Sequence, residues 1–141
     1  RDKEIPLAGG RNFSIPGNVR IIGTMNTADR SIALVDHALR RRFAFLALYP
    51  DYDVLRHYHE RKETGFALEG LIRTLKRLND RIDDCHYHVG ITFFLNEHLE
   101  CEIEDIWRME IEPYLEEYFF DQPGEVESFR WHQVADEICE S

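Results

Sequence analysis

Two apolar runs separated by one helical pattern constrain the fold of this chain more than any other feature. Residues 19–25 and 43–49 are nearly continuous apolar runs of strand length, the pattern of strands covered on both faces of a parallel sheet. Ser31 is a good helix N-cap, and apolar residues follow it at helical spacing: Ile32, Leu34, Val35, Ala38 and Leu39. This order predicts a βαβ unit with a right-handed crossover.

The rest of the chain divides at Pro50. Residues 5–15 are predicted to form a β-hairpin around Gly9-Gly10. After Pro50 the apolar spacing is helical in four stretches: 53–62, 67–83, 99–120 and 124–139. Within the third stretch, Pro113 is expected to start or kink a helix. The predicted fold class is therefore α/β plus all-α, with the C-terminal part of a sheet domain at 1–50 and a helical subdomain at 51–141.

The charge distribution limits the partners of the helical part. Residues 1–62 carry 11 Lys+Arg and 7 Asp+Glu, or +4, which leaves 6 and 20, or −14, for residues 63–141. An acidic half is a poor surface for nucleic acid, because phosphate contacts need cations. If the protein acts on DNA, another domain is expected to touch it. The three cysteines follow no metal or disulfide spacing, which predicts a reducing, cytoplasmic setting. No apolar run is long enough to span a membrane.

Asn26 and the run Arg40-Arg41-Arg42 are the candidate functional residues. Asn26 ends the first apolar run, at the edge where open α/β sheets bind ligands, and its amide both donates and accepts hydrogen bonds. A turn or capping asparagine is the alternative. Guanidinium groups at a helix end can stabilise phosphate charge, although cations there also complement the helix dipole or simply face solvent. At about 100° per residue, the three arginines cannot all face one phosphate.

Three motifs resemble one family. Residues 21–43 closely resemble the sensor-one and arginine-finger region of McrB-type AAA+ proteins, the GTP-hydrolysing motor subunits of modified-cytosine restriction systems. Residues 111–120 resemble the lid helix of that family, and residues 89–94 resemble its Ile-Gly-His-Ser-Tyr-Phe signature. Ile91 stands where the family usually has histidine. The resemblance covers about residues 12–122 and implies the C-terminal part of an AAA+ P-loop NTPase core followed by a helical lid.

The resemblance implies roles for particular residues. Asn26 is expected to be the sensor-one residue, and Arg41 and Arg42 are the expected arginine-finger residues. A second set is assigned to nucleotide sensing or the subunit interface: Thr27, Asp29, Arg30 and Arg40. Asp29 could equally cap the following helix. The implied cofactor is GTP or ATP with Mg²⁺, and the implied partners are other copies in a ring, expected to be a hexamer, a McrC-like nuclease subunit, and DNA bound through another domain.

Two motifs of a complete NTPase are missing from this sequence. It contains no Gly-x-x-x-x-Gly-Lys-Ser/Thr loop and no apolar strand ending in Asp-Glu. The chain alone is therefore expected to be inactive. Two other functions remain open: a protein-remodelling AAA+ ATPase without a DNA role, and a nonenzymatic interaction module. The histidine-containing runs 57–59 and 85–88 lack a matching second half, so no metal site is predicted.

Overall fold

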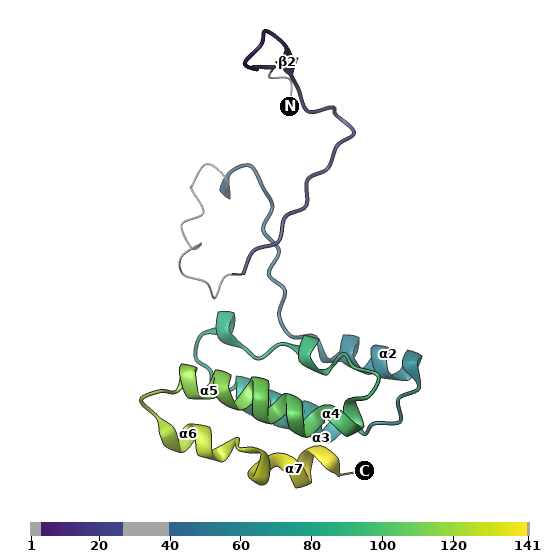
Figure 1. The fold of residues 1–141 in the computed structure, drawn as a ribbon, viewed down its shortest axis with the longest axis vertical. Coiled ribbons are helices and arrows are strands. Elements are labelled where there is room, and N and C mark those ends of the chain that lie inside the picture. The colour runs from purple at the N-terminus through teal and green to yellow at the C-terminus, as the bar shows by residue number, and fades with distance from the viewer. Residues whose placement is uncertain (1–3, 27–39, 141) are drawn as a thin grey trace. The chain divides into compact units, whose positions relative to one another are not determined.

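A computed structural model describes residues 4–26 and 40–140 of the chain (Figure 1). The chain forms two compact units, residues 1–35 and residues 36–141. The described part of the first unit contains a two-stranded sheet, and that of the second is mostly helical. None of the described helices is long and apolar enough to cross a membrane.

The first unit contains the predicted hairpin. β1 (Ile5–Pro6) pairs antiparallel with β2 (Asn12–Phe13), and the first residue of β1 lies opposite the last residue of β2. Gly9 and Gly10 form the connection with φ angles of 110° and 73°. A side chain would strain the backbone at such angles, which explains the two glycines. The prediction of a hairpin around Gly9-Gly10 is confirmed.

The strands predicted at residues 19–25 and 43–49 are not formed. Neither segment has strand pairing with a described residue, and their apolar side chains are largely exposed: Ile21 58%, Ile22 92%, Leu46 86% and Leu48 92%. A strand requires a neighbour that completes its backbone hydrogen bonds, and the described residues provide none to these segments. The predicted βαβ unit is therefore absent from the described structure. Most of the helix predicted between the strands lies outside the described residues, and Arg40 is helical.

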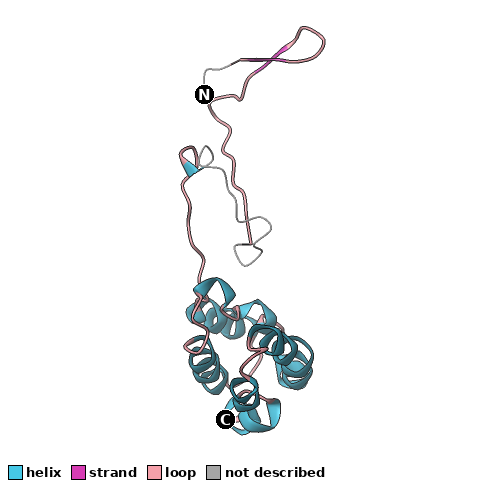
Figure 2. Cartoon of the chain, turned by 90° about the vertical axis from the view of Figure 1, so that its left-hand side faces the viewer, coloured by secondary structure: helices cyan, strands magenta, loops and turns pink. Residues whose placement is uncertain are grey.

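The second unit begins with helix α2 (Tyr52–Lys62), which the sequence predicts at 53–62. The Asp51 carboxylate caps this helix by accepting a hydrogen bond from the Asp53 amide at 3.0 Å. The helix ends at Lys62, and the C-cap residue Glu63 adopts a left-handed conformation with φ 51°. Residues 43–50, which form neither helix nor strand, lead into this helix as a loop, drawn in pink in Figure 2.

Helix α3 (Leu68–Asn79) forms the centre of the helical unit. Its predicted apolar stripe is buried, with Leu71, Leu75 and Leu78 all inaccessible to solvent. α3 packs against α7 (Trp131–Cys139), and Gly70 lies at their contact. A Cβ added to Gly70 would lie 1.8 Å from the carbonyl oxygen of Glu137, so the two backbones approach as closely as only glycine allows.

Replacing Gly70 by alanine is expected to lower the free energy of unfolding by about 1–3 kcal/mol, because α7 must move to admit the methyl group. Urea unfolding followed by circular dichroism measures the change. Gly124→Ala is the matched control, since Gly124 also lies in a helix but has open space around its Cβ position. Alanine there should leave stability unchanged or raise it by up to about 1 kcal/mol. Equal effects at the two glycines would contradict the packing argument.

The predicted helix at 99–120 is one rod with a widened turn. It consists of α4 (Leu99–Ile106), a π-turn η3 (Trp107–Ile111) and α5 (Glu112–Tyr118). Pro113 has no N–H and its ring would clash with the carbonyl four residues earlier in an α-helix. The π-turn directly precedes α5, so the wider spacing accommodates the ring. The prediction of a helix start or kink at Pro113 is confirmed.

The last predicted helix is divided in two. α6 (Pro123–Ser128) and α7 are separated by Phe129 and Arg130, and the Arg130 backbone is extended. The prediction of a single helical segment over 124–139 is therefore corrected. The buried side chains of all these helices form a single core, together with Val89 and Phe94 from the loop region between α3 and α4. That region also contains two short 3₁₀ turns, η1 (Cys85–Tyr87) and η2 (Ile91–Phe94).

The η2 turn explains the departure at Ile91. This side chain is partly buried and packs against the core cluster, so an isoleucine suits the position where the family usually has histidine.

Tyr114 of α5 fixes the neighbouring η1 turn by donating a hydrogen bond to the Tyr87 carbonyl. Burial of the phenol raises the pKa of Tyr114 to about 12.

Candidate functional site

Asn26 belongs to the first unit and is the last described residue before residue 40. It is exposed and lies outside any strand. An exposed amide can reach a phosphate or a water molecule, which a side chain enclosed in apolar packing could not do. Three further candidates lie outside the described residues: Thr27, Asp29 and Arg30.

The arginine run belongs to the second unit. Arg40 is helical, Arg41 and Arg42 form the turn that follows, and all three are exposed. The guanidinium carbon of Arg40 lies 5.7 Å from the ring centre of Phe45, a cation–π arrangement. Neither Arg40 nor Arg41 forms an ion pair with another described residue. The run is therefore a concentration of exposed positive charge, as the sequence predicts.

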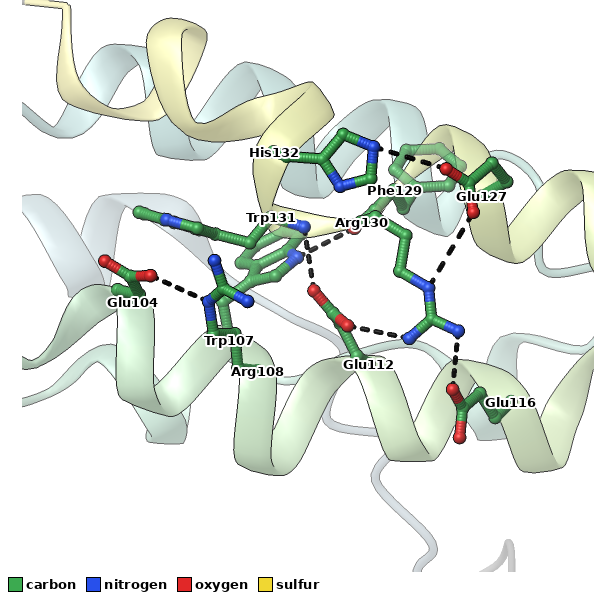
Figure 3. Close-up of polar contacts among 10 residues, drawn as sticks. All are labelled: Glu104, Trp107, Arg108, Glu112, Glu116, Glu127, Phe129, Arg130, Trp131 and His132. Atoms are coloured by element: carbon green, nitrogen blue, oxygen red, sulfur yellow. Dashed lines mark hydrogen bonds and ion pairs between the residues drawn. The ribbon is translucent and has the colours of Figure 1, made fainter.

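Arg130 organises a polar network in the helical unit that the sequence does not reveal (Figure 3). Its guanidinium contacts Glu112 at 2.7 Å and Glu116 at 2.6 Å. The other carboxylate oxygen of Glu112 accepts the Trp131 amide at 2.7 Å and so caps the first turn of α7. The hydrogen bond to Glu112, followed by that to Glu116, raises the pKa of Arg130. The network joins α5 to the turn between α6 and α7.

Trp107 makes a second contact with the same turn. Its ring is inaccessible to solvent, and its indole N–H donates to the carbonyl of Phe129 at 2.8 Å (Figure 3). Through the buried ring and the hydrogen bond of Trp107, η3 contacts the connection between α6 and α7. Together with the Arg130 network, this contact ties the α4–η3–α5 rod to the turn between α6 and α7.

A shallow hollow of about 250 Å³ lies where residues 49–52 enter the helical unit. Its lining combines aromatic rings, a proline, an amide, an imidazole and side chains of both charges: Tyr49, Pro50, Tyr52, Lys76, Asn79, Asp80 and His88. Buried Asn79 shapes it, since its side chain accepts from the Val89 amide at 2.8 Å and donates to the Val89 carbonyl at 3.1 Å. The Lys76 ammonium lies 5.4 Å from the ring centre of Tyr52. The hollow is polar and partly aromatic, and it adjoins the segment that follows the arginine run.

The histidine-containing runs offer few ligands for a metal ion. His59 cannot serve, because Nε2 donates to the Phe94 carbonyl at 2.8 Å and Nδ1 lies 2.7 Å from the Thr64 hydroxyl. Within the described residues, one group brings three possible ligand atoms within 4.8 Å of one another: Asp84, Cys85 and His86. These residues are consecutive in one turn, and no other feature of the described residues points to an ion at this turn.

Comparison with known proteins places the helical unit in a family. A family model described as "McrB, alpha-helical lid domain" matches residues 70–127, which run from α3 into α6. The chain is also 38% identical over 139 residues to the type IV methyl-directed restriction enzyme EcoKMcrB subunit of Escherichia coli strain K12. The alignment covers 84% of this chain and 30% of that protein, so the chain spans less than a third of its relative. No solved structure matches the chain significantly.

Proposed function

The chain is of the McrB type, and on this premise we propose that it is the sensor-one to lid part of an AAA+ nucleoside triphosphatase. The full-length protein binds GTP or ATP with Mg²⁺ and hydrolyses it between the subunits of a ring, which we expect to be a hexamer. Hydrolysis drives a McrC-like nuclease subunit that cleaves modified DNA. Another domain of the full-length protein contacts this DNA, and the system acts in the cytoplasm. The observation that carries this proposal is the 38% identity to a restriction-enzyme subunit over most of the chain.

The exposed apolar segments support an AAA+ core. Residues 19–25 and 43–49 have the composition of buried strands but lie largely uncovered in the described structure. We propose that both pair with further strands of the full-length protein, so that residues 1–50 complete a sheet domain and residues 51–141 form its lid. That sheet would hold Asn26 at its rim, where open α/β sheets bind ligands.

Asn26 is proposed to orient the attacking water. Its amide N–H₂ donates to an oxygen of the γ-phosphate, and its carbonyl accepts from the water. The water oxygen bonds to the γ-phosphorus as the bond to the leaving nucleoside diphosphate breaks, and a proton of that water passes to an oxygen of the transferred phosphate. No covalent enzyme intermediate forms. Mg²⁺, when bound, would neutralise phosphate charge, and it would be held by motifs that this sequence does not contain. The exposed position of Asn26 is consistent with this role.

The arginine run is proposed to complete the pocket of a neighbouring subunit. Arg41 or Arg42 contacts the γ-phosphate of that neighbour and stabilises the charge that develops in the transition state. Arg40, together with Thr27, Asp29 and Arg30, is assigned to nucleotide sensing or interface ion pairs. The high density of exposed positive charge at residues 40–42 supports this arrangement.

The helical unit is proposed to move as one body when nucleotide binds. The Arg130 network and the buried Trp107 contact join its C-terminal helices, so motion at residues 49–51 would displace the whole lid rather than bend it. The hollow is lined by Tyr49, Pro50 and Tyr52, so such motion would change its shape.

Substituting Asn26 by alanine in the full-length protein tests the proposal. We expect turnover to fall by about 10²-fold, comparable to losing one preorganised donor at a reacting centre, while nucleotide affinity changes little. Phosphate release under saturating GTP and ATP, with Mg²⁺, measures both nucleotides. Asn18→Ala is the matched control, since Asn18 is also an exposed asparagine of the first unit.

The outcomes separate the alternatives. Undiminished turnover in Asn26→Ala would reject the sensor role. A wild-type protein that binds nucleotide without hydrolysing it would favour the interaction module. Hydrolysis that supports no DNA cleavage with a McrC-like partner would favour a remodelling ATPase.

A further inference from the structure

The outer side of the α4–η3–α5 rod carries a row of exposed apolar side chains. Met109 is 69% exposed and Phe120 is 82% exposed, and Pro113 between them is exposed as well. At about 100° per residue, and slightly less through the π-turn, Met109 and Pro113 return to the same side of the rod, and Phe120 follows in the turn after α5. The core side of the rod is occupied by Ile111 and Leu115, both inaccessible to solvent. The row therefore belongs to no part of the described core.

The same rod is strongly acidic. The rod and the turn after it, residues 99–121, contain nine Asp+Glu and a single Lys or Arg, Arg108, which pairs with Glu104 at 2.7 Å. Arg130 compensates two of the remaining carboxylates, Glu112 and Glu116. Three other acids near the apolar row in the sequence form no ion pair with another described residue: Glu110, Glu117 and Asp121. An apolar row bordered by uncompensated carboxylates is left facing solvent.

We propose that this face docks a cationic amphipathic helix of a partner protein. From Met109 to the end of α5 at Tyr118 the rod runs nine residues, or about 14 Å along a helix axis, a length that matches two to three turns of a partner helix with an apolar stripe. Lysine or arginine side chains on the flanks of that stripe would meet the bordering carboxylates. This proposal goes beyond nucleotide hydrolysis, which needs no ligand on this face.

Charge argues against the other occupants. Nucleic acid would set phosphates against carboxylates. A second copy of the helical unit would oppose two acidic surfaces, because residues 63–141 carry a net charge of −14. The arginine run of another copy is assigned to the nucleotide. A basic segment from a different protein is the occupant that satisfies both the apolar row and its acidic border.

The test uses the full-length protein and a labelled synthetic peptide, an 18-residue Leu/Lys amphipathic helix, followed by fluorescence anisotropy. Met109→Glu and Phe120→Glu are each expected to weaken binding by about 10-fold or more, because each loses an apolar anchor. Val54→Glu is the matched control. It places the same charge at an apolar residue of α2 that is 49% exposed, and it should leave the affinity within about twofold. A Gly/Lys peptide of equal charge should bind at least about 10-fold more weakly.

Equal effects at Met109, Phe120 and Val54, or equal binding of the two peptides, would reduce the interaction to nonspecific charge and overturn the proposal. A change in the assembly state of Met109→Glu and Phe120→Glu, without a change in peptide affinity, would assign the face to contact between copies and would also overturn it. Nucleotide hydrolysis is measured on the same variants. It should match the wild type, so that failure of the docking proposal is distinct from failure of the proposed NTPase.

Discussion

Replacing Trp107 by alanine is expected to lower the free energy of unfolding of the helical unit by about 3–5 kcal/mol. The indole is inaccessible to solvent and lies between Phe94 and Trp131, with ring centres 6.4 and 6.5 Å away. Alanine would leave a cavity, remove these aromatic contacts and leave the Phe129 carbonyl without its donor. A loss of this size approaches the whole stability of a small domain.

Urea unfolding followed by circular dichroism measures this loss as a shift in midpoint at constant slope. Trp107→Phe should cost less, because it keeps a ring in the core and loses mainly the hydrogen bond to Phe129. Phe120→Ala is the matched control for aromatic removal. That ring is 82% exposed, so its loss should change stability by no more than about 0.5 kcal/mol. A Trp107→Ala variant as stable as Phe120→Ala would show that the indole does not hold the core together.

The helical unit was predictable because its signals are local. The apolar period places Leu71, Leu75 and Leu78 on one side of α3, and those residues are buried in the structure. The Gly9-Gly10 pair likewise predicts its own hairpin, since only the turn residues need the unusual φ angles. In both cases the residues that determine the element lie within it or next to it.

The remaining features depend on partners far along the sequence. The strands at 19–25 and 43–49 needed neighbours, and the apolar pattern alone does not supply them. The break between α6 and α7 depends on the Glu112 carboxylate, which accepts the amide of a residue 19 positions later. The burial of His59 depends on the Phe94 carbonyl, 35 positions later. A periodic pattern carries no information about such contacts.

The candidate site was partly predictable for the same reason. Asn26 and the arginine run stand in a contiguous motif, so the sequence could name them. Arg130 and Glu112 carry no local signature, and only the structure identifies their network. Asn26 and the arginines are proposed to act on a nucleotide bound between subunits. The arrangement of these side chains around the nucleotide therefore depends on residues that a single chain does not provide.

The largest effect on activity is expected from the arginine finger. In the full-length protein, alanine at the finger position, Arg41 or Arg42, should reduce turnover by about 10³-fold or more, with nucleotide affinity largely retained. Arg40→Ala should have a smaller effect, because its guanidinium lies over Phe45. Arg61→Ala is the matched control, an exposed arginine in the last turn of α2, and should leave turnover within about twofold. Steady-state phosphate release compares the four variants.

Mixing experiments distinguish a finger that acts on a neighbour from one that acts within its own subunit. A subunit with alanine at the finger keeps an intact phosphate pocket, and a subunit that lacks its phosphate-loop lysine keeps an intact finger. If the arginine acts across the interface, mixed rings of these two inactive variants should regain part of the wild-type turnover, because some pockets receive every group they need. If it acts in its own subunit, no mixture restores a complete pocket. Turnover that stays at background at every mixing ratio, in rings that assemble normally, would place the arginine in the pocket of its own subunit.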